Sequence, residues 1–154
     1  MTPRRAGPGD EARVAALWIA LTEHHAQVEP LFALRPGGEA EARRLVAVQL
    51  RDPDTAVFVL EAGEELCGFC TARIDRAPPI HAEDVRAEIT DLWVTPPRRR
   101  AGLGRALVDA ALAFVRGRGV ARVEARVAAR NGEGQAFWRA QGFGDFMDVL
   151  NRRL

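Results

Sequence analysis

The stretch Arg99-Arg100-Ala101-Gly102-Leu103-Gly104 lies between an apolar β-type run and an amphipathic helical pattern. Pro96-Pro97 ends the apolar run, so a strand, a loop with two glycines and a helix follow one another directly. A helix that begins there presents backbone N–H groups without intrahelical partners, together with the positive end of its dipole. A glycine adds no side chain that would keep an anion away from this backbone. The segment therefore predicts a binding site for a phosphate or pyrophosphate group.

The spacing of the two glycines excludes two common phosphate-binding loops. A Walker loop ends in Lys-Ser or Lys-Thr, but this chain contains no lysine and its 22 basic residues are all arginine. A dinucleotide fingerprint needs a third glycine, and Leu107 occupies that position. The pattern that fits is R-x-x-G-x-G, at Arg99, Gly102 and Gly104. It resembles the pyrophosphate arm of the GCN5-related N-acetyltransferase (GNAT) superfamily, although a glycine turn without a ligand is an alternative.

A second segment further along the chain is similar to a later motif of the same superfamily. Asn131, Phe137, Gly142 and Phe143 have the spacing of Asn-x-x-Ala-x-x-(apolar)-Tyr-x-x-x-Gly-Phe. The resemblance implies that Asn131 contacts the pantetheine arm of acetyl-CoA and that Phe137 flanks the coenzyme. Gly142 is expected to end a helix before the last strand. Core packing is the alternative role for Phe137 and its neighbour Trp138.

Two residues depart from the superfamily pattern, and one of them bears on the mechanism. Gly134 replaces the usual alanine, a change that weakens a helix by about 1 kcal/mol. Trp138 replaces a tyrosine that protonates the departing CoA thiolate in many relatives, and the chain has no tyrosine at all. A tyrosine general acid is therefore excluded. Two hypotheses remain: an N-acetyltransferase in which water or another group protonates the thiolate, and a non-catalytic domain that binds and senses acyl-CoA.

The resemblance implies acetyl-CoA as the co-substrate and direct transfer of its acetyl group to a primary amine of a small molecule or peptide. The backbone of Leu92–Val94 would pair with the pantetheine arm, as an added strand pairs with a sheet edge. The arginine-rich run beside the glycines would contact the pyrophosphate or the 3′-phosphate. The implied cofactor-binding residues are Leu92, Trp93, Val94, Arg99, Arg100, Ala101, Gly102, Leu103, Gly104, Arg105, Asn131 and Phe137.

An amine acceptor must lose a proton before or during its attack on the acetyl carbonyl, so the site needs a base. Glu88 is the first candidate, because histone-acetylating relatives place a catalytic glutamate at the same offset, six residues before Val94. Asp91 is the second candidate. Alternatively, both carboxylates line a solvated strand edge or pair with Arg86 or Arg98. Acidic residues around Glu88 weakly favour a cationic amine, and the identity of the acceptor stays open.

The composition fits one domain over residues 1–154, with a formal net charge of +1 and 47% hydrophobic residues. This balance gives no electrostatic reason to expect nucleic acid or a membrane as partner. No segment reaches the length of about 18 apolar residues that a membrane span needs, and the N-terminus does not resemble a secretory signal. A cytoplasmic location is expected, and the superfamily and the apolar last segment are compatible with a homodimer.

The sequence predicts no metal site. Cys67 and Cys70 form C-x-x-C within a strand pattern, where residues three apart point to opposite faces. His24, His25 and His81 are scattered, so the number of ligands for zinc is too small. We therefore expect two small buried thiols.

Hydrophobic periodicity gives the remaining elements. Helices are expected after the N-cap candidate Asp10, over Glu39–Leu50, from Leu103 to a stop at Gly117 and Gly119, and over Gln135–Gln141. Strands are expected over Ala56–Leu60, Leu66–Ile74, Arg86–Val94, Val120–Val127 and Phe146–Leu150. This order indicates a three-layer α/β domain with a mixed sheet. The resemblance adds that the sheet is centrally splayed, as in the acyl-CoA N-acyltransferase fold.

Overall fold

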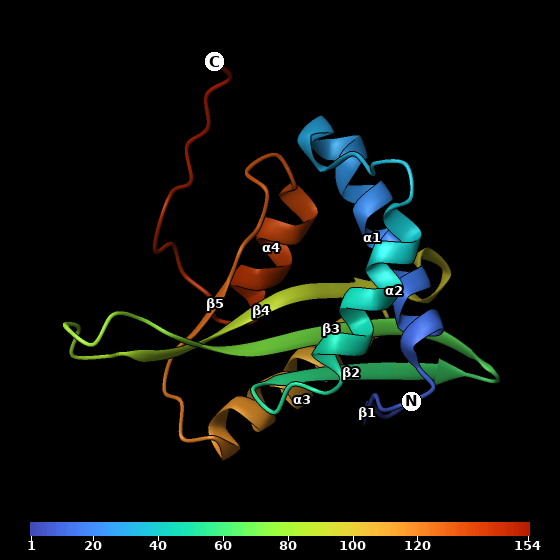
Figure 1. Cartoon of the computed structure of the whole chain (residues 1–154), viewed down its shortest axis with the longest axis horizontal. Helices are drawn as coiled ribbons and strands as arrows, with labels where there is room; N and C mark the ends of the chain where they lie inside the picture. Colours follow the sequence, from blue (N-terminus) through green and yellow to red (C-terminus); the bar gives the residue numbers. More distant parts are fainter.

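The computed structural model describes residues 1–154 and is built on one five-stranded sheet (Figure 1). The strands are β1 (Arg4–Arg5), β2 (Thr55–Ala62), β3 (Glu65–Arg76), β4 (Val85–Val94) and β5 (Val123–Ala125), in that order across the sheet. The helices are α1 (Glu11–Val28), α2 (Gly38–Gln49), α3 (Leu103–Gly117) and α4 (Gly132–Ala140), with short 3-10 turns η1 (Pro30–Phe32) and η2 (Pro96–Arg98). β4 and β5 are parallel and the other neighbours are antiparallel, so the predicted mixed sheet is confirmed.

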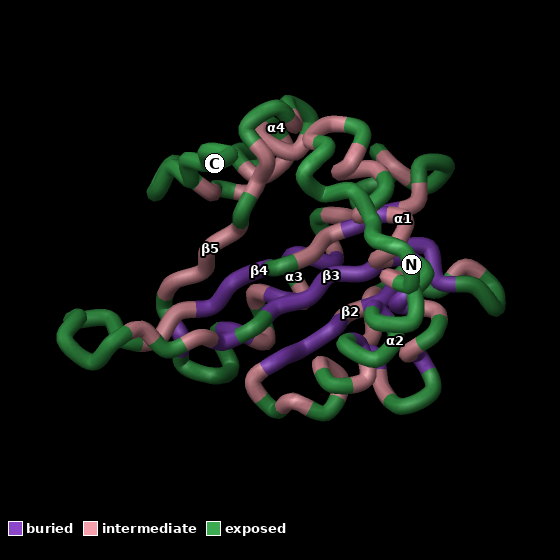
Figure 2. Tube along the Cα trace, turned by 45° about the horizontal axis from the view of Figure 1, so that its top comes forward, coloured by how far each residue is buried: buried purple, intermediate pink, exposed green.

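Helices cover both faces of the sheet. α1 and α2 pack on one face in a cluster that includes Val14, Val46 and Phe69, while α3 packs on the other through Leu107 and Ala111. The central strands β2 and β3 are buried between these layers over most of their length, and β4 over about half of it (Figure 2). The predicted three layers are thereby confirmed. None of the helices combines the length and the apolar character needed to cross a lipid bilayer.

The predicted splay lies between β4 and β5. These strands pair only from Ala87 to Ile89 and from Val123 to Ala125, after which β5 turns away toward α4 (Figure 1). β4 continues to Val94 without a partner on that side. A register shift in its pairing with β3 makes Thr90 an extra, bulged residue at this point. The fork therefore leaves one edge of β4 open from Thr90 to Val94.

The prediction of a last strand over Phe146–Leu150 is wrong. The segment has no regular secondary structure, and the side chains of Phe146, Met147, Val149 and Leu150 are exposed. An apolar segment forms a strand only where a neighbouring strand edge exchanges hydrogen bonds with it, and this segment has no such partner. The expected strand Val120–Val127 is shorter for a related reason, because β5 leaves β4 after Ala125.

Two smaller expectations are also corrected. Cys67 and Cys70 do not lie on opposite faces: a bulge pairs Leu60 with Gly68 but Glu61 with Leu66, which makes Cys67 an extra residue. Both cysteines therefore pack in the cluster that α3 covers, where they are free and buried as expected. Burial raises the pKa of the Cys70 thiol. Asp10 is the N-cap residue of α1, as expected, but its side chain accepts no hydrogen bond from the N–H groups of the helix.

Candidate functional site

The glycine turn between β4 and α3, residues 99–104, contains several backbone N–H groups without a hydrogen-bond partner. Gly102 has φ +75° and forms the N-cap of α3, a left-handed conformation that suits glycine. Arg100 also has a positive φ, 64°, which costs a side-chain-bearing residue about 1–2 kcal/mol. No backbone N–H group from Arg100 to Arg105 donates a hydrogen bond within the protein. Free donors at a helix N-terminus form a ready site for an anion.

The arginines of this turn do not all face the free N–H groups. The Nε atom of Arg99 donates to the carbonyl oxygen of Val94 at 3.0 Å, and its guanidinium lies 4.4 Å from the centre of the Trp93 ring. Its side chain is therefore directed back along β4. Arg100 and Arg105 have exposed side chains, with loose ion pairs of 3.8 Å to Glu133 and Asp109. These two guanidinium groups can reorient toward an anion at the turn.

The second sequence motif lies against the glycine turn. A Cβ added to Gly104 would come 3.3 Å from Cε2 of Phe137, so the absence of a side chain at Gly104 lets this ring lie close to α3. Asn131 is the N-cap of α4, and its Oδ1 atom accepts a hydrogen bond of 2.9 Å from the N–H group of Gly134. A Cβ on Gly134 would come 2.7 Å from Nδ2 of Asn131. The glycine in place of alanine thus accommodates this cap, and the Nδ2 donor of Asn131 has no partner.

Trp138 contributes to packing at the position where many relatives have tyrosine. Its ring lies edge-on to Phe137, with centroids 5.3 Å apart, and edge-on to Phe143, with centroids 4.9 Å apart. These three rings pack against the cluster beneath α3. The indole N–H group is no useful proton donor for a thiolate, so packing accounts for this residue.

Glu88 lies at the base of the fork between β4 and β5. It is 7% exposed, and it pairs in the sheet with Glu124 of β5. Its two oxygens face Nη2 of Arg73 at 3.4 Å and Nε of Arg126 at 3.2 Å. Arg86, one of the two partners that the alternative interpretation offered, instead pairs with Glu124 at 3.3 Å. Glu88 is thus a nearly buried carboxylate between two guanidinium groups.

Asp91 lies next to the bulge on the same strand and is half-buried. Burial raises its pKa, and the charge of Glu88 raises it further. Hydrogen bonds from the Thr90 hydroxyl, at 2.6 Å, and from the side chain of Trp18 act in the opposite direction. A carboxyl group with a raised pKa is suited to accept a proton near neutral pH.

The sequence did not predict a row of neighbouring aromatic side chains that covers the end of β4. The ring of His24 lies 5.2 Å from Trp93 and 6.4 Å from His25, which in turn lies 5.7 Å from Phe32 of η1. Burial and the neighbouring His24 lower the pKa of His25. The indole nitrogen of Trp93 is buried without a hydrogen-bond partner. The C-terminal half of α1 therefore forms an aromatic wall beside the open edge of β4, which only the pair His24-His25 could have signalled.

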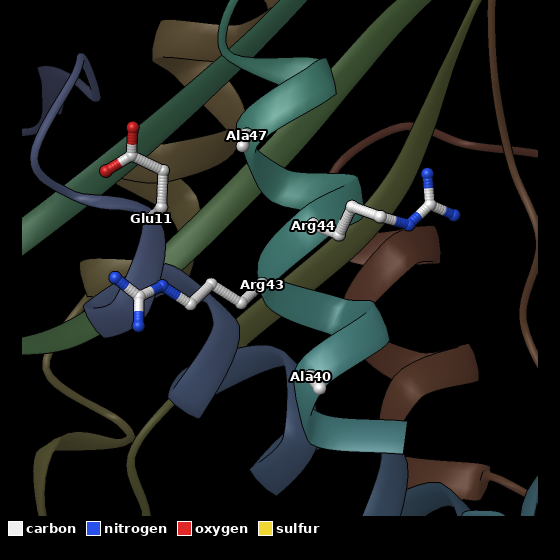
Figure 3. Close-up of a pocket in the computed structure, with 5 residues that line it drawn as sticks. All are labelled: Glu11, Ala40, Arg43, Arg44 and Ala47. Atoms are coloured by element: carbon white, nitrogen blue, oxygen red, sulfur yellow. The ribbon is translucent and has the colours of Figure 1, made fainter. Parts of the chain in front are cut away.

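A surface hollow of about 450 Å³ lies elsewhere, between α1 and α2 (Figure 3). Glu11, Arg43 and Arg44 line it together with two alanines. None of them belongs to the glycine turn or to the fork. The site is therefore defined by backbone geometry and charged side chains at the end of the sheet, and not by this hollow. No group of His, Cys, Asp and Glu side chains is arranged to hold a metal ion.

Comparisons with known proteins agree with this geometry. A model of the acetyltransferase (GNAT) family matches residues 18–143. Mycothiol acetyltransferase from Clavibacter michiganensis subsp. michiganensis is 31% identical over 137 residues, which make up 88% of this chain and 42% of that protein. A second mycothiol acetyltransferase, from Clavibacter sepedonicus, matches to the same extent. The chain thus spans about two fifths of the length of these curated relatives.

Solved structures share the fold at lower sequence identity. A tetramutant of the BH1408 protein from Bacillus halodurans has a TM-score of 0.85 and 21% identity, with all of both chains covered. An aminoglycoside N-acetyltransferase in complex with CoA has a TM-score of 0.77 and 17% identity, with 99% of this chain and 93% of that chain covered. The family match includes β4, the glycine turn and the second motif. The chain belongs to the acetyltransferase (GNAT) family of enzymes.

Proposed function

We propose that this domain transfers the acetyl group of acetyl-CoA to a primary amine of a small molecule or peptide by direct attack of the amine. The observation that carries the proposal is the row of free backbone N–H groups from Arg100 to Arg105 at the start of α3. Such a row matches the charge and hydrogen-bonding needs of a pyrophosphate. The family membership supports acetyl-CoA as the molecule that carries this group.

The chain offers contacts for the rest of the coenzyme beyond the turn. We assign the pyrophosphate to the N–H groups of Gly102–Arg105, with the side chains of Arg100 and Arg105 within reach as counter-charges. The pantetheine arm is assigned to the open edge of β4 over Leu92–Val94, where unpaired backbone groups can bind an extended chain. Phe137 and the free Nδ2 donor of Asn131 lie beside this path. Bound acetyl-CoA supplies the activated acyl group.

We assign two carboxyl groups to the amine: Glu88 binds its ammonium form, and Asp91 accepts its proton. An alkyl ammonium ion is attracted by the carboxylate of Glu88 at the base of the fork. The raised pKa of Asp91 supports its role as the proton acceptor, directly or through water. A backbone N–H group on the open edge of β4 can stabilise the negative charge that develops on the acetyl oxygen.

We assign water as the proton donor for the departing CoA thiolate, because Trp138 is packed among aromatic rings and the chain has no tyrosine. The same observation supports one alternative function: a domain that binds acyl-CoA as a sensor without turnover. The names of the relatives, mycothiol acetyltransferase and aminoglycoside N-acetyltransferase, support an enzyme that acts on a small molecule. A cytoplasmic location and a homodimer stay predictions from the sequence.

Two measurements test the proposal. Calorimetry with acetyl-CoA tests binding, and release of free CoA in the presence of a panel of primary amines tests transfer, with Glu88→Gln and Asp91→Asn as variants. Saturable binding and amine-dependent release that falls in these variants support the transferase. Tight binding without release for any amine supports the sensor. A protein that shows no affinity for acetyl-CoA contradicts both functions.

A further inference from the structure

Arg126 occupies a distinctive place in the fork. It is the first residue after β5, directly beyond the last pairs that join β5 to β4. Its Nε atom lies 3.2 Å from Oε1 of Glu88, and its side chain is 74% exposed. It has no other carboxylate partner. The guanidinium group therefore extends from the solvent side over the carboxylate of Glu88, whereas the neighbouring carboxylate of Glu124 pairs with Arg86 and Arg122.

Arg73, the other partner of Glu88, makes its shorter hydrogen bonds to a different residue. The guanidinium group of Arg73 makes two hydrogen bonds of 3.0 Å to Asp75, and it reaches Oε2 of Glu88 only at 3.4 Å. Oε1 of Glu88 accepts no hydrogen bond with good geometry, although it faces Arg126 as an ion pair. A nearly buried carboxylate requires compensation by a positive charge. Arg126 supplies this positive charge, and because its side chain is exposed another cation can replace it at Oε1 of Glu88.

We infer that the guanidinium group of Arg126 holds the place of the acceptor's ammonium group at Oε1 of Glu88, and that a primary ammonium ion displaces it on binding. This inference rests on the proposed function. The exchange replaces one ion pair by another and leaves Glu88 compensated throughout. An exposed arginine loses little when it swings into solvent, because such pairs contribute little to stability. An ammonium group is compact and has N–H donors that reach a recessed oxygen more easily than a planar guanidinium group.

The inference also defines the substrate class at this position. The site takes a single unhindered ammonium group with free N–H donors, attached to an alkyl carbon. A quaternary ammonium ion carries the same charge but cannot donate a hydrogen bond to Oε1.

The test measures binding of n-butylammonium to the protein of residues 1–154 through the carboxyl ¹³C signal of Glu88, assigned by its loss in Glu88→Gln. Arg126→Gln is expected to bind this ion about 1.5- to 5-fold more tightly than the unmodified protein, since the competing cation is gone. Arg130→Gln is the matched control, because Arg130 is equally exposed but pairs with Glu29 at 3.8 Å. This control is expected to bind as the unmodified protein does, and butyltrimethylammonium is expected not to shift the signal.

Equal or weaker binding in Arg126→Gln overturns the inference, as does a quaternary ion that binds as well as n-butylammonium. The same samples are titrated with acetyl-CoA by calorimetry, which tests the proposed function separately. Acetyl-CoA binding without an effect of Arg126 contradicts only the inference. An effect of Arg126 on ammonium binding without acetyl-CoA binding upholds the ammonium site and contradicts the transferase function.

Discussion

The ring of Phe137 lies against Gly104, 3.3 Å from the position that a Cβ atom on this glycine would occupy. Gly104 is in the first turn of α3 and Phe137 is in α4, so this contact joins two segments that are far apart in sequence. The spacing of the glycines thus serves two purposes. Gly102 provides the left-handed turn, and Gly104 provides the room for the neighbouring helix.

Gly104→Val is expected to lower the free energy of unfolding by about 1–3 kcal/mol, because the added atoms force the Phe137 ring outward. Adding Phe137→Ala to this variant should cost less than Phe137→Ala costs alone. Urea denaturation of the four proteins measures this coupling. Gly117→Val, where an added Cβ meets no atom within 4 Å, serves as the control. Strict additivity of the two changes contradicts the contact.

Gly102→Ala is expected to weaken acetyl-CoA binding by about tenfold or more, since it crowds the free donors of the turn. The left-handed conformation adds a stability loss of about 1–2 kcal/mol. Gly63→Ala is the matched control: Gly63 has φ +71° in the β2–β3 hairpin, and its added Cβ also meets no atom within 4 Å. It should show a similar stability loss with unchanged affinity in calorimetry. Similar affinity losses in both variants speak against a coenzyme site at the turn.

Asp91→Asn is expected to reduce kcat by about 10²–10⁴-fold and to remove the acidic limb of its pH profile. Glu88→Gln should mainly raise KM for the amine, because it removes the charge that attracts the ammonium ion. Steady-state kinetics from pH 5 to about 9 distinguish the two roles. An effect of Asp91→Asn on KM alone assigns the base elsewhere.

The stability of Asp91→Asn provides an independent check with a definite sign. The raised pKa of Asp91 means that the folded protein keeps this proton to higher pH than the unfolded chain does. The folded state is therefore favoured at low pH, and this advantage is lost as the pH rises through the folded-state pKa. The asparagine variant should be at least as stable as the unmodified protein at pH 7. Its relative advantage should shrink as the pH falls toward about 4, the pKa of an unfolded aspartate.

Asp10→Asn should show the opposite dependence on pH. The carboxylate is 5% exposed and accepts hydrogen bonds from Arg4, Arg13 and the N–H group of Gly7. These contacts, with Arg4 the largest contributor, hold the pKa of Asp10 well below its usual range. The variant should lose about 1–3 kcal/mol at pH 7. The difference should diminish as the pH falls below about 4 and through the folded-state pKa. A constant difference from pH 7 to about 2 contradicts this account.

Local patterns predicted the elements on which the site is built. The glycine spacing and the break at Pro96-Pro97 placed the turn between β4 and α3, because these residues act on the backbone of their own segment. The second motif lies against the first, a contact between α4 and α3 that the spacing of residues did not predict. The three layers followed from the order of helices and strands.

Features that depend on pairing between distant segments were not predictable in this way. Pairing of Glu88 with Arg86 or Arg98 was one alternative, but its partners come from β3 and from the end of β5, which depends on strand register. The bulge at Cys67 reversed the face on which one thiol was expected. Phe146–Leu150 has a strand-like pattern and no strand to pair with. Sequence periodicity indicates which secondary structure a segment can form. Strand register and the available pairing partners decide which structure it forms and which face each side chain occupies.

The two cysteines buried beneath α3 have a practical consequence for enzymology. Both are enclosed by the core, and the sulfur of Cys70 resists ionisation, so neither is poised to react with an electrophilic dye. A chromogenic disulfide reagent can therefore be present throughout an assay of the native protein with little background colour. Any free thiol that the reagent detects under those conditions is the thiol of released CoA.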